Sequence, residues 1–380
     1  MKPGRQHTAP RGRVRWMFAA LLLALLACRA AAAEPLQPPS GYRNAVGSKH
    51  SDAVICEAPP EPFTGTLEFP SKYEGSGAAR DQLNVEAEAA YKLKTRPITS
   101  MEKGVVALVK KTMRSGKPEA LKCTLGWLTR WAEAGALLGE AKNHTGRSLR
   151  KWSLGSLASA YLRLKFSSSA PLKNYPKESQ RIEAWFSAIA DHVVIEWPAS
   201  DPIEKINNHY YWAAWALMAA SVATDRRDLF DHAVTLYRVF AQQVDAEGYL
   251  PNELKRASRA AGYHNYAMAP VAMIAAFGKA NGVDLAGESD HALTRLAQRA
   301  EIALNDPARF ETKTGVAQDG NGLDSKSSRA WLEPYCWTVT CTADERAMRE
   351  SSRPLASTRL GGELTAVFAT TAASAHEEGP

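Results

Sequence analysis

The chain has 380 residues, of which 45% are hydrophobic and 23% charged, a composition typical of a globular protein and not of a disordered or collagen-like chain. Its formal net charge is +7, but six of the 47 basic residues fall within the first 33 positions, where no acidic residue occurs. Without that segment, 41 basic residues face 40 acidic ones. This balance argues against a general nucleic-acid-binding surface and leaves room for local basic clusters that bind an acidic ligand.

The first 33 residues read as a secretory signal peptide. A basic region that ends at Arg15 is followed by an almost unbroken apolar run, 16–27, and then by small residues up to Ala33. The apolar run is shorter than the roughly 20 residues that span a bilayer, and no later segment reaches that length without charges, so we expect no membrane span. We expect cleavage near Ala33; the alternative is a lipoprotein cut before Cys28.

Export favours disulfides between the four cysteines that follow Cys28. Cys336 and Cys341 are close enough in sequence to form a local bridge, so we pair them with each other and pair Cys56 with Cys123. Zinc binding is the competing interpretation, but no histidine lies near either pair at the spacing of a zinc finger.

The body of the chain is predicted to be helical, because apolar residues recur at three- and four-residue steps and period-two strands are scarce. Turn-forming Gly, Pro and Asn separate the periodic segments, which are 105–113, 125–137, 154–164, 182–197, 211–222, 229–244, 266–277 and 292–304. Helices of this length with short loops predict antiparallel hairpins arranged as a bundle, a solenoid or an α/α toroid. No repeat of fixed period is found, which argues against a regular solenoid.

The chain is accordingly divided into three parts. Residues 1–33 are the signal peptide, and residues 34–364 form one helical domain. Residues 365–380 are small and polar for the most part, so we expect a disordered tail there.

A first candidate motif opens one of the predicted helices. In a helix, Asn208, Trp212 and Trp215 lie on one face, with His209 beside them. Amides, an imidazole and indoles suit a sugar acid, because they supply donors for its carboxylate and hydroxyls and a flat apolar surface for its ring. For the two tryptophans alone a place in the core is the better interpretation, whereas adjacent Asn208 and His209 favour a functional role.

A second motif places three cations before two tyrosines: Lys255, Arg256 and Arg259 precede Tyr263 and Tyr266. A cationic neighbourhood lowers the pKa of a phenol and so makes tyrosine usable as a base. Arg256 and Tyr263 have the same seven-residue spacing as Arg259 and Tyr266, so the spacing does not choose between these pairs. A solvated surface is an equally good interpretation of Lys255 and Arg259.

Together these motifs resemble those of the alginate lyases of polysaccharide lyase family 5, which are periplasmic poly(β-D-mannuronate) lyases. The resemblance covers nearly the whole chain after the signal peptide. It rests on NNHYYWAAW at 207–215, DRRDLF at 225–230, PNELKR at 251–256, YHNY at 263–266, SKYEGS at 71–76, NHTG at 143–146, RKW at 150–152, WLEPYC at 331–336 and RLGG at 359–362. It implies an all-α fold of the α/α toroid type, a periplasmic location, alginate as polyanionic partner, an alginate secretion complex as a further partner, and no metal or other cofactor.

The resemblance also implies residue roles. Asn208, His209 and Arg256 match the residues that face the substrate carboxylate, and Tyr263 matches the catalytic tyrosine. The remaining candidates are substrate-binding residues: Lys72, Tyr73, Trp212, Tyr266 and Arg259.

The chemistry expected of these residues is β-elimination. The C5 proton of a uronate is weakly acidic, so neutralising the neighbouring carboxylate stabilises the enolate-like transition state, and Tyr263 takes the proton as base. In mannuronate the C5 proton and the C4 oxygen leave from the same face, so one phenol serves both. The product carries a C4=C5 double bond, in a 4-deoxy-hex-4-enuronosyl group at the non-reducing end.

Two other functions fit parts of the sequence. An inverting glycoside hydrolase on an α/α barrel would use a carboxylate pair such as Asp201 and Glu253. A non-catalytic periplasmic alginate-binding protein would use the same aromatic and basic surface without shortening the polymer. Candidates for steering a polyanion toward the site are Arg147, Arg150, Arg226 and Arg227, each equally well a solvated charge.

Overall fold

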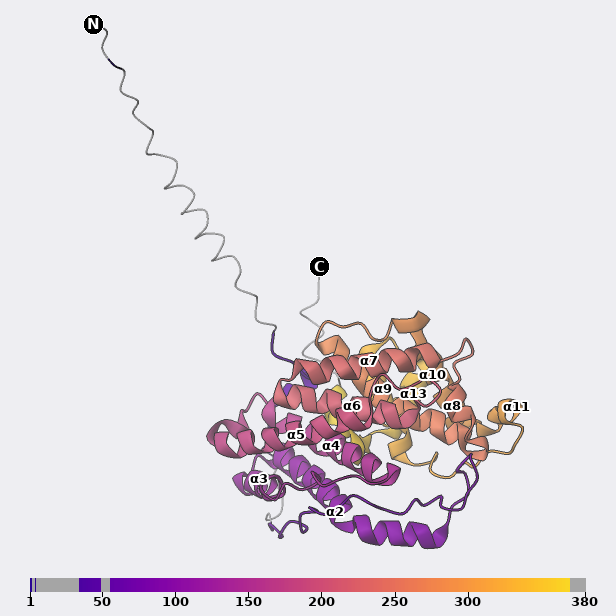
Figure 1. Cartoon of the computed structure of the whole chain (residues 1–380), viewed down its shortest axis with the longest axis horizontal. Helices are drawn as coiled ribbons and strands as arrows, with labels where there is room; N and C mark the ends of the chain where they lie inside the picture. Colours follow the sequence, from indigo (N-terminus) through magenta and orange to yellow (C-terminus); the bar gives the residue numbers. More distant parts are fainter. Residues whose placement is uncertain (2–3, 5–33, 49–54, 370–380) are drawn as a thin grey trace. The chain divides into compact units, whose positions relative to one another are not determined.

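A computed structural model describes residues 1, 4, 34–48 and 55–369 (Figure 1). The chain divides into two units after Pro35, and the fold described below is that of the second unit, which begins at Leu36. The predicted signal peptide lies almost entirely outside the described residues. Within the part of the chain that the structure describes, no helix combines the length and the apolar composition needed to cross a membrane.

The second unit is built almost entirely from helices, with short 3-10 helices labelled η. In chain order the elements are η1 Ser40–Arg43, α2 Val85–Ser115, α3 Pro118–Glu133, α4 His144–Lys165, η2 Pro171–Asn174, α5 Pro176–Glu196, α6 Asn208–Thr224, α7 Arg227–Gln243, α8 Pro251–Leu254, η3 Ala257–Arg259, α9 Ala260–Ala280, α10 Glu288–Asn305, η4 Pro307–Phe310, α11 Glu311–Thr314, η5 Lys326–Arg329, α12 Leu332–Thr338, α13 Ala343–Ser352, β1 Ala356–Ser357, η6 Thr358–Leu360, β2 Gly362–Glu363 and α14 Thr365–Phe368. Strands β1 and β2 pair antiparallel. Each predicted helical segment falls on one of these helices, with differences only at the ends.

The long helices form two layers. Helices α2, α4, α6, α9 and α12 pack side by side as an inner layer, and α3, α5, α7 and α10 follow them in the chain and cover them as an outer layer (Figure 1). Each inner helix with its successor makes a hairpin, and neighbouring hairpins pack on one another. This is the arrangement of an incomplete α/α toroid, and it confirms the predicted fold class.

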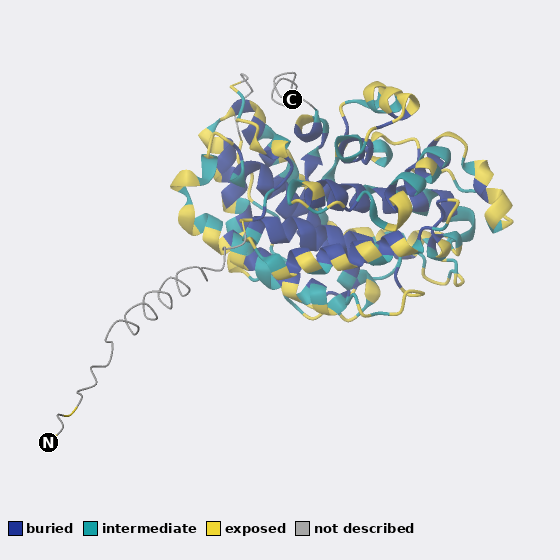
Figure 2. Cartoon of the chain, turned by 90° about the horizontal axis from the view of Figure 1, so that it is seen from above, coloured by how far each residue is buried: buried dark blue, intermediate teal, exposed yellow. Residues whose placement is uncertain are grey.

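The sequence explains which helices lie inside. In α6 every residue from 210 to 223 is buried, and this helix contains no charged side chain. Outer helix α7 is buried along one stripe only, at three- and four-residue steps from Leu229 to Ala241. A helix that is apolar on all sides gains most from packing on all sides, so α6 lies within the molecule while α7 keeps one face toward solvent. Figure 2 shows the buried residues gathered in the middle of the helices and the exposed residues around them.

Both predicted disulfides are present. Cys56 is bonded to Cys123, and Cys336 to Cys341. The competing zinc interpretation is therefore wrong for these four residues.

The two disulfides are expected to differ in their effect on stability. A disulfide stabilises mainly by restricting the unfolded chain, and more so for a longer loop. The sequence separations are 67 and 5 residues. Replacing both Cys56 and Cys123 by Ala should therefore lower the free energy of unfolding by about 4 kcal/mol, against about 2 kcal/mol for the Cys336 and Cys341 double variant. Urea unfolding of the two variants measures the difference, and equal losses would contradict the loop-length argument.

The domain extends further toward the C-terminus than the sequence indicated. The tail was predicted to begin at residue 365, but Thr365–Phe368 form helix α14, with Val367 and Phe368 buried. The Thr365 hydroxyl donates to the buried Glu333 carboxylate, 2.6 Å away. Val367 and Phe368 hold this helix in the core, but the small residues on either side of them in the sequence made the segment look like a tail. Residues 370–380 lie outside the described residues.

Candidate active site

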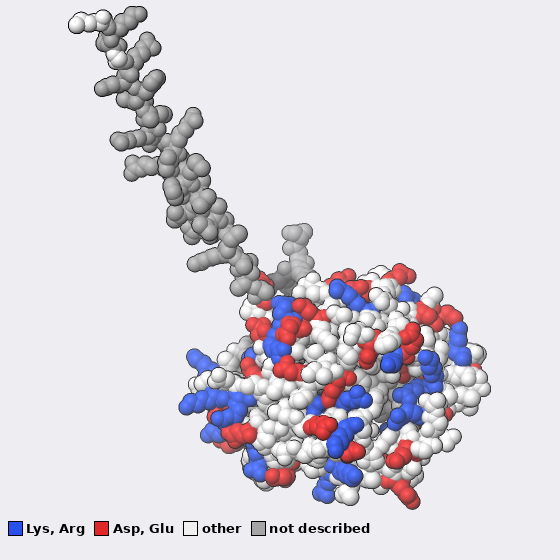
Figure 3. Space-filling view, viewed as in Figure 1, with Lys and Arg blue, Asp and Glu red and all other residues white. Residues whose placement is uncertain are grey.

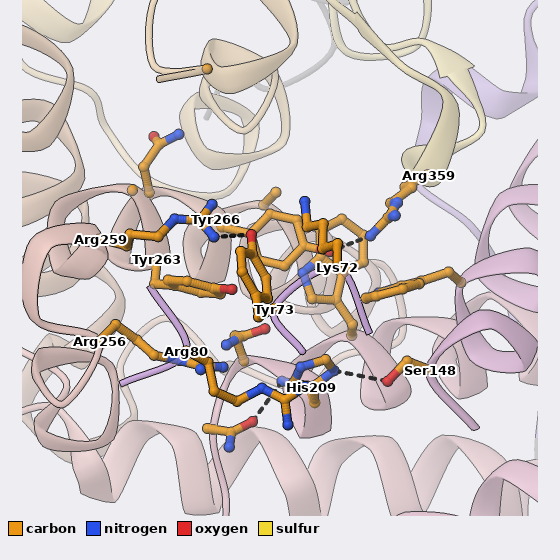
Figure 4. A pocket seen from close by; sticks show the side chains of 18 of the residues that line it. Lys72, Tyr73, Arg80, Ser148, His209, Arg256, Arg259, Tyr263, Tyr266 and Arg359 are labelled. Atoms are coloured by element: carbon orange, nitrogen blue, oxygen red, sulfur yellow. Dashed lines mark hydrogen bonds between the residues drawn. The ribbon is translucent and has the colours of Figure 1, made fainter. Parts of the chain in front are cut away.

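A cavity of about 980 Å³ opens where the inner helices begin (Figure 4). Its wall is formed by the first turns of α2, α4, α6 and α9 and by the segments 71–80, 204–207, 252–259, 321–328 and 357–359. Helix N-termini carry a partial positive charge and unpaired N–H groups, so several of them around one cavity favour a bound anion. The side chains add to this field, because seven Lys and Arg residues line the wall against two carboxylates. The cavity is therefore suited to an acidic ligand.

Every site residue predicted from the sequence lies in this wall. They are Lys72, Tyr73, Asn208, His209, Trp212, Arg256, Arg259, Tyr263 and Tyr266. Figure 4 shows most of these side chains converging from separate segments of the chain. The structure thus brings the two sequence motifs and the 71–76 segment together at one place.

Tyr263 lies between two guanidinium groups. The Arg256 Cζ atom is 4.5 Å from the centroid of the phenol ring, and the Arg259 Cζ atom is 5.3 Å from it. Among the described residues, nothing forms a hydrogen bond with the Tyr263 hydroxyl, which leaves it available to a ligand. This arrangement combines a free phenol oxygen with adjacent positive charge.

Tyr266 is placed differently, and this separates the two Arg–Tyr pairs that have equal spacing. Arg359 donates a hydrogen bond to its hydroxyl, and burial raises the pKa of Tyr266 to about 12. Arg259 does not bond to Tyr266 but donates to the hydroxyl of Tyr73. The Tyr266 ring packs against Trp212, with centroids 4.9 Å apart. Tyr266 therefore contributes aromatic surface and is a poorer candidate base than Tyr263.

Glu253 organises two of the predicted residues from behind the wall. Its fully buried carboxylate accepts hydrogen bonds from the backbone N–H of Asn208 at 2.6 Å and from Asn208 Nδ2 at 3.0 Å to each oxygen. Its Oε2 atom lies 4.0 Å from Arg256 Nε, and the other end of this guanidinium donates to the carbonyl of Ala79 at 3.3 Å. Burial raises the pKa of Glu253, while the bonds from Asn208 and the charge of Arg256 oppose that rise.

The amide of Asn208 differs from the sequence prediction in one respect. The predicted role requires Nδ2 to face the substrate carboxylate, but in this structure Nδ2 faces Glu253 and the buried Oδ1 has no hydrogen-bond partner among the described residues. Turning the amide over would exchange the two atoms, but Oδ1 would then face the Glu253 carboxylate, so the turned amide requires a protonated Glu253, a form that the raised pKa of this group favours.

The carboxylate pair of the hydrolase alternative is not assembled. Neither Asp201 nor Glu253 lines the cavity, and Asp201 accepts a hydrogen bond from the Tyr210 hydroxyl. The cavity carboxylates are Glu88 and Glu204 instead, and Glu88 pairs with Lys92 at 2.9 Å. The structure therefore does not support the acid–base pair that hydrolysis would need.

His209 is enclosed by rings on one side and by donors on the other. Its ring stacks on Trp197, with centroids 5.8 Å apart and planes at 7°, and the His144 ring meets it edge-on at 4.3 Å. Nδ1 lies 3.1 Å from Ser148 Oγ and 3.2 Å from Lys151 Nζ. Burial lowers the pKa of His209 well below its ordinary value, and the charge of Lys151 lowers it further. Both effects disfavour a second proton on the imidazole.

Several residues of the wall or its support were not predicted from the sequence. Arg359, from η6 near the C-terminus, lies over the Trp152 ring at 3.9 Å, and Lys151 is buried directly behind His209. Arg80 and His144 also line the cavity. Helical periodicity does not single out any of them; the only signal for Arg359 and Lys151 was their place in the RLGG and RKW segments.

Two of the arginines suggested for steering have structural roles instead. Arg150 is buried, donates to the carbonyls of Leu137 and Gly139, and pairs with Glu196. Arg226 forms an ion pair with Asp191 at 2.6 Å and another with Asp228, and it does not line the cavity. These arrangements correct the steering interpretation for both residues.

Buried histidines should make stability depend on pH. Burial lowers the pKa of His144 to about 3 and that of His264 to about 4. An unfolded histidine has a pKa of about 6.5, so below that pH the unfolded chain binds protons that the folded chain does not. Each of these histidines should therefore lower the free energy of unfolding by up to about 1.4 kcal/mol per pH unit as the pH falls from 6.5 toward 4.

The variant His264→Gln tests this dependence away from the cavity. The Nε2 atom of His264 accepts a hydrogen bond from the backbone N–H of Leu250, 2.8 Å away, and a glutamine oxygen can replace that acceptor without titrating. Urea unfolding at several pH values should show a shallower loss of stability in the variant. The same slope in both proteins would contradict the assignment.

An α/α toroid with a cationic, aromatic cavity at its helix N-termini suits a protein that acts on acidic polysaccharides. The chain matches the Alginate lyase family over residues 68–310, a range that contains all nine predicted site residues. An alginate lyase of Pseudomonas fluorescens Pf-5 is 52% identical to it, over 94% of this chain and 95% of that protein. An alginate lyase of Cobetia marina is also 52% identical, over 92% of this chain and 93% of that protein. The protein therefore belongs to the alginate lyase family.

Solved structures agree with the fold. A variant of alginate lyase A1-III complexed with a tetrasaccharide superposes with a TM-score of 0.71 at 21% identity, covering 88% of this chain and 91% of that one. An alginate lyase from Bacteroides ovatus gives a TM-score of 0.55 at 16% identity, with 92% of each chain covered. At these identities the likeness concerns the fold alone.

Proposed function

We propose that the protein cleaves the 4-O-glycosidic bonds of poly(β-D-mannuronate) by β-elimination and leaves a 4-deoxy-hex-4-enuronosyl group at the new non-reducing end. The observation that carries this proposal is the free hydroxyl of Tyr263, which lies beside two guanidinium groups in a cavity lined mainly by cations. Membership of the alginate lyase family supports alginate as the substrate.

The first requirement of the reaction is to stabilise the charge that builds up when C5 loses its proton. The electron pair moves onto the carboxylate, which already carries a negative charge, so preorganised donors and cations around it lower the barrier. Arg256 and the N–H of His209 can provide this from two sides of the cavity, together with the N-terminus of α6. Asn208 would join them with its amide turned so that Nδ2 faces the ligand and Oδ1 accepts a hydrogen bond from a protonated Glu253.

The second requirement is a group that moves the proton. The Tyr263 oxygen takes the proton from C5, and as the C4–O4 bond breaks it returns a proton to O4. One oxygen can do both when the C5 hydrogen and O4 lie on the same face of the sugar, as they do in mannuronate. In guluronate they lie on opposite faces, so the single phenol favours polymannuronate.

The other predicted residues would bind the chain on either side of the cleaved bond. Lys72 and Arg259 present cations, and Arg259 also holds Tyr73 in place through its hydroxyl. Trp212 and Tyr266 give packed aromatic faces on which sugar rings can lie. These roles predict weaker binding, with a smaller effect on the chemical step, when they are replaced.

The protein would act after export. The basic and apolar pattern of residues 1–33 indicates a cleaved signal peptide, and the two disulfides fit an oxidising compartment. We therefore propose a periplasmic location, where an alginate secretion complex would be a partner.

Ultraviolet absorbance during incubation with polymannuronate tests the proposal directly. Purified mature protein should produce a rise from the C4=C5 double bond, a smaller rise on polyguluronate, and no change in rate when a chelator is added. Shortened chains without absorbance would show hydrolysis and overturn the proposal. Bound polymer of unchanged length would show a binding protein.

A further inference from the structure

Lys151 is a buried cation directly behind the site. It lies on α4, and its side chain is inaccessible to solvent. Burial lowers its pKa well below the ordinary value, and Glu196, the carboxylate that would favour its charge, is already paired with Arg150. A buried lysine without a carboxylate of its own is costly, so its contacts call for an explanation.

Among the described residues the ammonium group has three close contacts beside His209, and a more distant one with the Trp152 ring at 5.7 Å. Nζ donates to the backbone carbonyl of His209 at 2.7 Å, lies 3.2 Å from His209 Nδ1, and sits 3.3 Å from the centroid of the Trp197 ring. A lysine ammonium has three N–H donors and no acceptor. The carbonyl, the imidazole nitrogen and the aromatic face therefore satisfy one hydrogen each.

With one excess proton on the pair, these contacts determine where the imidazole carries its hydrogen. If the shared proton is on Nζ, Nδ1 must accept, and the hydrogen of the neutral ring is on Nε2. If the proton moves across the 3.2 Å to Nδ1, the ring becomes an imidazolium, which again has a hydrogen on Nε2. Both arrangements leave an N–H on the nitrogen that no described residue binds.

We propose that Lys151 is a positioning residue that shares one proton with His209 Nδ1 and thereby keeps the Nε2–H of His209 directed at the substrate carboxylate. As negative charge grows on that carboxylate, the Nζ–H bond breaks and an Nδ1–H bond forms, which brings the positive charge one side chain closer. The proton returns when the product leaves. This inference rests on the proposed function, since it gives His209 its task there.

The surroundings of the pair are consistent with a mobile charge. Lys151 is under the influence of Arg359, Arg147 and Glu196, and His209 under that of His144, Arg256 and Arg359, and among these groups Glu196 alone is acidic. Their net repulsion disfavours a second proton on the pair. One proton shared between two nitrogens is therefore the state to test near pH 7.

Lys151→Met removes the donor and keeps most of the side-chain volume. A matched control is Lys165→Met on the same helix, because Lys165 Nζ also donates to a backbone carbonyl, that of Ala223 at 2.7 Å, away from the cavity. Nitrogen NMR of the His209 ring in the protein without substrate should show hydrogen on Nε2 in the wild type and in Lys165→Met. In Lys151→Met the ring should gain an Nδ1–H form, because Ser148 can accept as well as donate.

Kinetics separates this positioning role from a structural one. Lys151→Met should lower kcat/KM by about 10- to 100-fold, as loss of a partner that orients an active group often does. Its pH profile should gain a titration as the pKa of His209 rises toward the ordinary range. In a His209→Gln background the amide carries its N–H whether or not Lys151 is present. There, Lys151→Met should lower kcat/KM only slightly further.

Two results would overturn the proposal. One is a wild-type ring with its hydrogen on Nδ1, or a tautomer unchanged in Lys151→Met. The other is an equal loss of kcat/KM from Lys151→Met in the wild-type and His209→Gln backgrounds, which would indicate a structural role. The NMR experiment needs no substrate, so it decides on the pair even if the protein fails to form an unsaturated product and the proposed function is wrong.

Discussion

Tyr263→Phe is expected to bind polymannuronate as the wild type does and to lose cleavage. The substitution removes one oxygen from a ring that keeps its contacts with Arg256 and Arg259. Since that oxygen would act as both base and acid, the loss of kcat should reach about 10⁴-fold, the upper end of what general acid–base groups contribute. Ultraviolet absorbance measures the turnover, and fluorescence or calorimetric titration measures the binding.

Tyr249→Phe provides the matched control for this prediction. Tyr249 also has a cation over its ring, with Arg299 Cζ at 4.9 Å and Lys313 Nζ at 5.3 Å, but it does not line the cavity. Its replacement should leave kcat unchanged within a factor of about two. Appreciable turnover by Tyr263→Phe would remove Tyr263 from the role of base, whereas equal losses in the two variants would point to a general effect of such Tyr–cation pairs on the fold.

Arg256→Ala is expected to have the second largest effect. Its guanidinium is held between Glu253 and the Ala79 carbonyl and lies against Tyr263, so its removal takes positive charge from both the carboxylate and the phenol. Loss of one preorganised charge of this kind should lower kcat by about 10² to 10³. A steady-state comparison of kcat and KM on polymannuronate tests it, with the larger change expected in kcat.

Arg299→Ala is the corresponding control, because Arg299 covers a tyrosine ring outside the cavity. It should keep nearly full activity. Circular dichroism decides the remaining alternative: if Arg256→Ala loses helical signal together with activity, Arg256 supports the fold and the predicted catalytic role is wrong.

The helical fold could be predicted because its signal is local, whereas the gathering of the nine site residues in one cavity was predicted from the motifs that resemble a known family. Three- and four-residue apolar steps mark an amphipathic helix such as α7 wherever it lies. Such steps do not separate core from site: Trp212 and Trp215 share a helix face, yet Trp212 lines the cavity while Trp215 is buried and donates to the carbonyl of Arg359. Only the position along the helix, one turn nearer its N-terminus, distinguishes them.

The support of the site could not be predicted, because it depends on distant parts of the chain. Glu253 holds Asn208 from 45 residues away, and Lys151 reaches His209 across 58. No sequence pattern indicates that the two residues of either contact meet in the fold. A carboxylate close to an arginine in sequence, as at 253–256, is equally typical of a surface ion pair. The orientation of the Asn208 amide is the clearest example, because it depends on the Glu253 carboxylate, whose position beside Asn208 could not be predicted from the sequence.

The wall of the cavity spans the chain from Ser71 to Arg359 and is complete only when the last short hairpin, β1 with β2, has closed over the first inner helix. A chain that has folded only as far as Ser352 would therefore carry the early site residues and yet lack the part of the wall that contains Arg359. We therefore expect catalytic activity only after the C-terminal segment has folded. A chain truncated after Ser352 should be inactive although it keeps Tyr263, His209 and Arg256. Turnover can thus serve as a readout of complete folding.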